Sequence, residues 1–496
     1  MKHFKHPNIL RFAFLLAFIF LMQSCSDFLE QEPGTKVSIT EQLENKKGLL
    51  QAMSGLYGEL EELMRFAPYA TYADLQGGNI KFTPTIGATS SSTNTGTISI
   101  RDNTAGIYSF DDRAEESNLA SFYANSYGII NQANLLLEFT DALPDATIEE
   151  KNQIKAEALT IRAYTHFLLS QVYSQNYGFT ADASHLGIVY SKASTNEKLT
   201  YPARETVANT YTLIINDIKT ALDLYTDNTL ISGPTYSYFN KVNTKALLSR
   251  VYLYKKDWKN AYDTANDIIS NSGVVLTVSE NYVAQWEQPD LPISEILLEF
   301  TVRRNNEGNA SLTMASAYGY TTNSNYGYYS ASNDLIYLYE SNDIRKQLFL
   351  TKSIGTIVNL QLVPLNYNFT KKYQDNPGYV AFRLSEQYLI RAEAAIGLNN
   401  VDQARTDINT IRARAKATLL TDNSNILEAL LLERRKEFCF EGHLFFDIAR
   451  NKKDVSRNDG CISSACSVTY PSPKYILPIP RSNINLNTNL KQNESY

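Results

Sequence analysis

The sequence predicts a mostly α-helical protein in which a helical-repeat scaffold carries an irregular, loop-rich lobe with short β-strands. Two observations lead to this fold class. Apolar residues recur at helical spacing in three stretches, about 41–66, 117–270 and 383–450. The stretches 67–112 and 271–345 keep no such period and are rich in Tyr, Gly and Asn. Because helix pairs of this kind bury their apolar faces only by stacking, the periodic stretches are expected to pack on one another.

Bulk composition limits the class of partner. The chain has 496 residues, of which 20% are charged, and a net charge of −6. No basic stripe is present to neutralise phosphates, which argues against nucleic acid as the main partner. Tyrosine stands out, with 33 residues against 2 tryptophans. Its ring combines an apolar face with a polar tip, so it suits contacts with sugar rings, peptides and protein interfaces.

Residues 1–24 predict a secretory signal peptide. A basic start precedes an apolar run over 9–22, which is too short for a comfortable membrane span, and no later segment reaches the roughly 18 apolar residues that a span needs. A small residue and then Cys25 follow this run directly, in the pattern of a lipoprotein cleavage site. We therefore expect Cys25 to become the acylated N-terminus of a single mature domain, 25–496. The alternative is a free or buried thiol beside an ordinary signal peptide.

Helix pairs account for much of the chain. A capping box formed by Thr147 and Glu150 predicts the start of one helix, because each side chain can satisfy a free first-turn amide. At 246–268, small residues alternate with aromatics in the tetratricopeptide pattern, in which small side chains let two antiparallel helices touch. A second copy lies at 384–415. These copies predict a tetratricopeptide-like scaffold.

The middle of the chain has a different character. Residues 295–302 predict a strand, and 317–329 then alternate Tyr with Gly, Asn and Ser. Polar, aromatic and turn-rich segments with little charge are typical of adaptable binding loops. Irregular structural packing is the alternative. The candidate ligand-binding residues of this segment are Tyr318, Tyr320, Tyr326 and Tyr328.

Three cysteines lie near the C-terminus. Cys461 and Cys466 share a Gly/Ser-rich loop and can form a small disulfide in an exported protein. A zinc site needs more ligands than this region offers, so no metal site is predicted. Cys439 lies within a helical pattern and is expected to be a buried apolar thiol.

The stretch 430–450 combines helical apolar spacing with a dense block of charge. Arg434 and Glu437 stand three residues apart, as do Asp447 and Arg450, so each pair can meet on a helix surface. A C-terminal packing helix is favoured over a catalytic carboxylate cluster. Its motif, E-R-R-x-E-x-x-F-E-G-H-x-x-F-D, resembles the late signature of the SusD/RagB family, the surface nutrient-binding lipoproteins of Bacteroidetes-type outer membranes.

Other segments carry the same resemblance. Residues 26–33 resemble the family's mature start, the helix at 156–173 resembles its A-E-x-x-x-x-R-A helix, and 475–493 resemble its L-P-I-P ending. In the family, the segment after the first helix contributes to the ligand-facing surface. This likeness makes three residues of the stretch 67–112 candidate ligand contacts, with a solvated surface loop as the equal alternative. They are Tyr69, Tyr72 and Asp74.

The resemblance implies an outer-membrane lipoprotein that faces the cell exterior, binds glycan nutrients for polysaccharide utilisation and delivers them to a SusC-like TonB-dependent transporter. It implies no cofactor and no enzymatic activity, and no calcium-loop signature is present. The alternatives are the same architecture capturing peptides, or a surface hydrolase or structural scaffold. The G-x-S-x-G, H-E-x-x-H and phosphate-loop motifs are absent from the sequence. A glycosidase pair is defined by a separation of about 5–9.5 Å in space, so sequence spacing leaves it open.

Overall fold

The structure, a computed structural model, describes residues 38–86, 96–195, 199–226, 228–287, 293–300, 314–373 and 378–496. Helices dominate it, which confirms the predicted mostly α fold. Within these ranges no helix is both long and apolar enough to cross a membrane. The longer helices are α3 (Lys46–Arg65), α7 (Ala120–Thr140), α8 (Ile148–Tyr173), α9 (Val207–Leu224), α10 (Lys241–Lys255), α11 (Trp258–Asn271), α15 (Leu384–Gly397), α16 (Val401–Arg414) and α17 (Ile426–Glu437).

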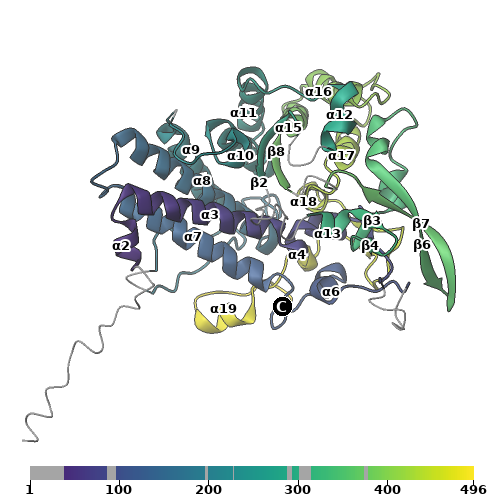
Figure 1. Ribbon diagram of the computed structural model, residues 1–496, viewed down its shortest axis with the longest axis horizontal. Helices are drawn as coiled ribbons and strands as arrows, with labels where there is room; N and C mark the ends of the chain where they lie inside the picture. The colour runs from purple at the N-terminus through teal and green to yellow at the C-terminus, as the bar shows by residue number, and fades with distance from the viewer. Residues whose placement is uncertain are drawn as a thin grey trace, which may run out of the picture.

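These helices form a continuous stacked layer. Helix α3 packs on α7, α8 lies between α7 and α9, and α10 packs against α9 and α11. The stack then passes from α11 to α15 and α16, although more than a hundred residues separate α11 from α15 in the chain. Figure 1 shows α3, α7 and α8 side by side, with the later helices continuing along one edge of the molecule. The predicted capping box is confirmed at the start of α8, where Thr147 and Glu150 exchange hydrogen bonds of 3.2 and 2.9 Å.

The two predicted tetratricopeptide-like copies correspond to α10–α11 and α15–α16, which pack on each other. Their small residues are fully buried, including Ala261 in the first copy and Ala404 in the second. Gly397, at the end of α15, lies against the indole ring of Trp258, and an added Cβ atom there would come 2.4 Å from the ring. Small side chains therefore allow the close approach on which the pattern depends.

Short elements build the other lobe. The stretch 67–112 was expected to be irregular, but much of it folds into short helices and a strand, because its aromatic residues are buried. The predicted strand at 295–302 is confirmed over 296–300 as β2, which pairs antiparallel with β8, and residues 301 and 302 lie outside the described residues. The short helices are α2 (Ile39–Leu43), α4 (Ala67–Ala70), α5 (Tyr72–Gly77), α6 (Ala105–Tyr108), α12 (Ser279–Trp286), α13 (Met314–Tyr318), α14 (Asn333–Ile336), α18 (Leu444–Arg450) and α19 (Arg481–Leu486). The strands are β1 (Ile80–Phe82), β2 (Ile296–Phe300), β3 (Tyr320–Thr322), β4 (Asn325–Tyr326), β5 (Tyr329–Ala331), β6 (Phe349–Val358), β7 (Gln361–Thr370), β8 (Tyr379–Arg383), β9 (Val455–Ser456) and β10 (Ser467–Val468).

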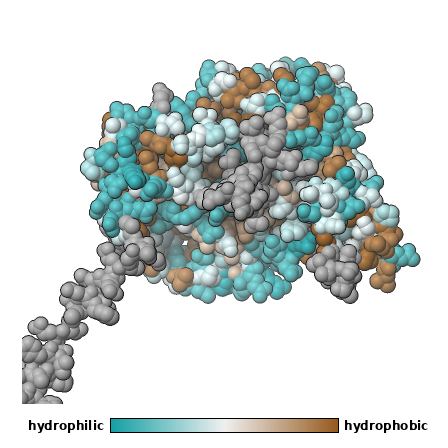
Figure 2. All heavy atoms as spheres, viewed as in Figure 1, coloured by the Kyte–Doolittle hydropathy of each residue, from teal (hydrophilic) through white to brown (hydrophobic). Residues whose placement is uncertain are grey.

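An antiparallel sheet in the order β1-β5-β7-β6 extends from this lobe. Its outer pair, β6 and β7, forms a hairpin of two ten-residue strands that closes at Asn359 and Leu360, both with positive φ as a two-residue type I′ turn requires. The hairpin projects from the body (Figure 1), and apolar surface gathers where it ends (Figure 2). Its base packs on a small apolar cluster that includes Tyr326, Ile354 and Phe369.

The stretch 430–450 forms two helices rather than one. Helix α17 ends at Glu437 and α18 begins at Leu444, because Phe440 and Gly442 between them have positive φ. Among the described residues, Arg434 and Glu437 do not form the expected ion pair. Arg434 instead pairs with Asp447 across the break at 2.8 Å.

The charges of this stretch are buried and not on a helix surface. Glu437 lies 2.6 Å from Arg383 and 2.8 Å from Arg345, and it also pairs with Arg414. Burial opposes its ionisation, but these three guanidinium groups hold the pKa of Glu437 well below its ordinary value. The cluster joins α17 to β8 and α16, so its role is to connect the two lobes.

Candidate functional site

Three of the residues that were predicted to contact a ligand, Tyr69, Tyr72 and Asp74, lie in the protein interior. Tyr69 stacks on Phe122 with ring centroids 4.1 Å apart, and Tyr72 meets Phe445 edge-on. Asp74 is fully buried. The expectation that these residues face a ligand is therefore corrected: α4 and α5 turn them into the core, where solvent does not reach them.

Asp74 instead holds two distant segments together. Its carboxylate accepts hydrogen bonds from the side chain of Asn79 at 2.8 Å and from the backbone of Phe440 and Gly442 at 3.0 and 3.2 Å. Burial raises the pKa of Asp74, while these hydrogen bonds favour its charged form. The residue thus supports the turn between α17 and α18.

Tyr318 requires the same correction. Its side chain is fully buried, with its ring 5.0 Å from that of Phe440 and 6.2 Å from those of Tyr329 and Tyr373. It belongs to the aromatic core under the lobe, which matches the alternative of structural packing.

The other three predicted tyrosines come together around one pocket of about 260 Å³. Tyr320, Tyr326 and Tyr328 all contribute to its wall, and Tyr328 is 45% exposed. The pocket opens between α13 and the β3–β4 hairpin. Its lining residues are Ile86, Ala315, Ser316, Gly319, Tyr320, Thr321, Asn325, Tyr326, Gly327 and Tyr328.

Backbone contacts hold this wall in place. The amide of Gly327 donates to Gly319 at 2.7 Å, and a Cβ atom on Gly327 would lie 2.5 Å from the carbonyl oxygen of Ala317. Thr83 donates from its amide to Tyr328 and from its hydroxyl to Gly327, at 3.0 and 2.8 Å. Only glycine allows the backbone at 327 to come this close to Ala317. The loop that the sequence identified by its alternation of Tyr and Gly is therefore closely packed.

The three pocket tyrosines differ in whether the hydroxyl group or the ring face is available to a ligand. Tyr326 donates its hydroxyl to the carbonyl of Pro84 at 3.0 Å, and burial raises its pKa, so the phenol stays neutral at physiological pH. Tyr320 donates to the side chain of Asn323 at 2.7 Å. The exposed ring of Tyr328 presents an apolar face to solvent. An aromatic face beside polar side chains can stack on a sugar ring and hydrogen-bond its hydroxyls.

Two cations lie against these aromatic rings. The guanidinium of Arg101 is 4.5 Å from the ring centroid of Tyr328, and the ammonium of Lys352 is 5.1 Å from that of Tyr320. Sequence reasoning missed both, because they are far from the tyrosines in the chain and neither belongs to a motif.

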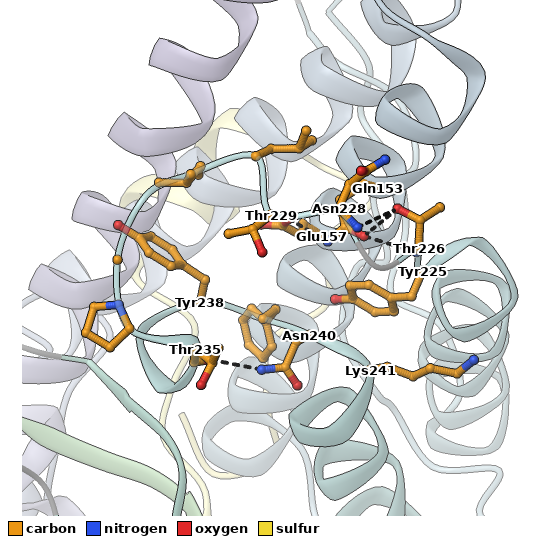
Figure 3. Close-up of a pocket in the computed structure, with 15 residues that line it drawn as sticks. Gln153, Glu157, Tyr225, Thr226, Asn228, Thr229, Thr235, Tyr238, Asn240 and Lys241 are labelled. Carbon is orange, nitrogen blue, oxygen red and sulfur yellow. Dashed lines mark hydrogen bonds between the residues drawn. The ribbon is translucent and has the colours of Figure 1, made fainter.

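A second pocket, of about 170 Å³, lies between α8 and the segment that leads into α10. Figure 3 shows Glu157 and Gln153 of α8 facing Thr229, Tyr225 and Tyr238 across it. Burial raises the pKa of Glu157 to about 7, although hydrogen bonds from Tyr57 at 2.6 Å and Gln153 at 2.8 Å act in the opposite direction. Among the described residues that line this pocket, Glu157 is the sole carboxyl group, whereas glycoside hydrolysis uses two.

Sequence reasoning overlooked this second pocket because Glu157 was treated only as part of a helix motif. The available signal was an acidic residue on a face of α8 where its neighbours Ile154, Ala158 and Ile161 are apolar. Such a position buries the carboxyl group without an ion-pair partner.

The described part of the chain offers few groups that could bind a metal ion or react as a free thiol. No group of three or more His, Cys, Asp or Glu side chains there could hold a metal ion. A disulfide joins Cys461 to Cys466, and Cys439 is a buried free thiol. Cys25, the expected lipid-attachment residue, lies outside the described residues.

Family comparisons cover both ends of the chain. A model described as "SusD family" matches residues 363–496. A second, described as "Starch-binding associating with outer membrane", matches residues 27–253. The chain belongs to the SusD family. Its mostly helical architecture is the one found in solved structures of the SusD superfamily.

Curated SusD relatives are distant in sequence. A SusD-like protein of Bacteroides ovatus is 24% identical over 383 residues, which are 68% of this chain and 66% of the relative. SusD-like protein P25 of Formosa agariphila is 21% identical over 90% of each chain. The starch-binding protein SusD of Bacteroides thetaiotaomicron is 37% identical over 121 residues, or 23% of this chain and 21% of the relative.

Solved SusD-type structures match over nearly their whole length. A SusD superfamily protein from Bacteroides thetaiotaomicron has a TM-score of 0.74 at 24% identity, covering 90% of this chain and 99% of that one. A SusD-like carbohydrate binding protein from Bacteroides vulgatus has a TM-score of 0.72 at 22% identity, covering 89% and 97%. At these identities the match establishes the shared fold.

Proposed function

We propose that this chain is a glycan-binding outer-membrane lipoprotein that faces the cell exterior. In this proposal residues 1–24 are a signal peptide, Cys25 carries the acyl chains, and 25–496 fold as a single SusD-like domain. The protein binds oligosaccharides without turnover and delivers them to a SusC-like TonB-dependent transporter. The family description of starch-binding proteins that associate with the outer membrane supports this proposal.

The observation that carries the proposal is the exposed aromatic wall of the pocket at Tyr328. Three tyrosines border this concave site, and close backbone contacts fix its glycines. A preformed aromatic face loses little conformational entropy on binding, so it suits capture of a sugar ring. We propose Tyr320, Tyr326 and Tyr328 as the ligand-binding residues.

Binding by the mature chain without its acyl group, residues 26–496, tests this proposal. A matched panel of oligosaccharides and peptides would be measured by isothermal titration calorimetry. Tyr328→Ala is expected to weaken glycan binding about tenfold, because it removes the exposed stacking face. Tyr328→Phe keeps that face and is expected to bind within about twofold of the wild type.

The control is Tyr337→Ala, which removes another exposed tyrosine that is 80% accessible and lies outside the pocket. It is expected to leave affinity unchanged. Glycan affinity that survives Tyr328→Ala would move the site elsewhere, and binding confined to peptides would replace the glycan assignment. Release of reducing sugar during the titration would contradict the absence of turnover.

Delivery to a transporter is tested separately. The full-length lipoprotein, purified from the outer membrane in mild detergent, is expected to carry a TonB-dependent transporter with it. Isolation of the protein alone at every detergent concentration would contradict a stable complex.

A further inference from the structure

Acidic residues are absent from the described segments that line the tyrosine pocket and from those that carry the cations beside it. Residues 83–86, 96–101, 314–332 and 344–373 include no Asp or Glu, although the chain as a whole has 52 of them. The same segments carry six Lys and Arg residues. Three of these six are paired elsewhere: Arg345 and Lys372 in the buried cluster, and Lys371 with Glu287 at 2.7 Å.

Arg101 and Lys352 stand out among the remaining three because both lie over the pocket tyrosines. Neither has an ion pair with a carboxylate in the described part of the chain. The Nε atom of Arg101 is buried and has no hydrogen-bond partner. Lys81 provides a contrast, because it lies 5.7 Å from the ring of Tyr367 but is neutralised by Asp459 at 2.8 Å.

We propose that the pocket selects anionic glycans, whose sugar rings carry a carboxylate or a sulfate ester. This inference rests on the proposed function, and it adds the class of ligand. A cation held on an aromatic face can pair with the anionic group while the exposed ring stacks on the sugar. The planar guanidinium of Arg101 can bind a carboxylate or sulfate with two parallel hydrogen bonds, a geometry that a lysine cannot offer.

Both kinds of glycan carry a fixed negative charge on a sugar ring. Two matched pairs of probes distinguish a carboxylate from a sulfate ester as the source of that charge. The first pair is tetragalacturonate and its fully methyl-esterified form, in which each carboxylate is replaced by a neutral methyl ester. The second is a sulfated galactan oligosaccharide and its desulfated form. In at least one pair the charged member is expected to bind at least tenfold more tightly, and this preference is expected to shrink as salt rises.

Two substitutions locate the selectivity. Arg101→Gln and Lys352→Gln are each expected to weaken binding of the charged probe about tenfold, with the neutral probe changed less than twofold. Arg101→Lys keeps the charge but loses the planar fork, so it is expected to recover only part of the affinity. The control is Lys219→Gln, which removes an exposed charge on α9 outside the pocket. Thermal melting of each variant separates loss of binding from loss of fold.

The outcomes distinguish this inference from the function on which it rests. Equal binding of both members of each pair, or tighter binding of the neutral ones, overturns the preference for anions and leaves glycan binding intact. A charged preference that persists in both Gln variants overturns the assignment to Arg101 and Lys352. Absence of binding to every charged and neutral saccharide overturns both proposals.

Discussion

The guanidinium of Arg383 lies 2.6 Å from the carboxylate of Glu437, and both side chains are fully buried between the helical layer and the irregular lobe. Arg383 is the last residue of β8, and it also pairs with Glu295 and Glu441, each at 2.7 Å. Arg383 thus pairs with three buried carboxylates, which lie just before β2, at the end of α17 and in the turn that follows α17. The motif by which the SusD family is recognised in this chain is therefore structural.

Removal of Arg383 should destabilise the fold severely. Arg383→Met is expected to lower the free energy of unfolding by about 3–5 kcal/mol, because it leaves buried carboxylates without their shared cation. Urea denaturation followed by circular dichroism measures this change. Arg405→Met is the control, since Arg405 pairs with an exposed Asp402 at 3.1 Å and should cost less than about 1 kcal/mol. Equal losses for the two variants would contradict a structural role for the buried cluster.

Glu157 should make stability depend on pH. Its pKa in the folded protein is raised to about 7, so the folded state holds a proton that the unfolded state has released above a pH of about 4.5. Its contribution to stability is therefore greatest in acid and is lost as pH rises from about 4.5 to 7. Glu157→Gln cannot lose this proton, so the stability of the variant relative to the wild type should rise by at most about 1.4 kcal/mol per pH unit across that window. Chemical denaturation at several pH values measures the difference, and parallel profiles for the two proteins would refute it.

Gly397→Ala should disturb the junction of the two helical copies. The added Cβ atom would lie 2.4 Å from the ring of Trp258, so α11 and α15 must move apart or the indole must change rotamer. We expect a loss of about 1–3 kcal/mol in urea denaturation. Gly55→Ala is the matched control in α3, where nothing lies within 4 Å of the new atom, and it should be neutral or stabilising by up to about 1 kcal/mol. A neutral Gly397→Ala would mean that the helices are less closely packed.

Cys25→Ala should release the protein from membranes. The acyl chains expected at Cys25 would be absent, so the variant is expected in the soluble fraction after cell lysis. Fractionation with immunodetection measures this distribution, and metabolic labelling with a fatty-acid probe should mark the wild type alone. Membrane retention of an unlabelled variant would indicate another means of attachment.

Local patterns predicted much of the scaffold. Helical spacing, the Thr147–Glu150 capping box and the two tetratricopeptide-like copies depend on residues close together in the chain, and the structure contains all three. The break between α17 and α18 was missed, because the apolar spacing continues through Phe440 although its φ is positive.

The candidate site was predicted only in part. The alternation of Tyr with Gly and Asn pointed to the loop that forms the pocket, and Tyr328 is exposed there. The same pattern did not separate Tyr328 from Tyr318, which is fully buried ten residues earlier. Tyrosine suits core and surface equally well, so a high tyrosine content does not show which tyrosines are buried and which are exposed.

The sequence by itself determined the mostly helical class, the repeat pairs and the family motif, because these depend on periodicity and on short-range spacing. Tertiary structure alone decided which tyrosines face solvent, which charges pair, and that Arg101 and Lys352 lie over the rings of Tyr328 and Tyr320. Those outcomes depend on contacts between segments that are far apart in the chain. Burial of Asp74 by the turn after α17 is one example, since more than 360 residues separate the partners. Such contacts are set by the packing of the whole molecule, and no local pattern records them.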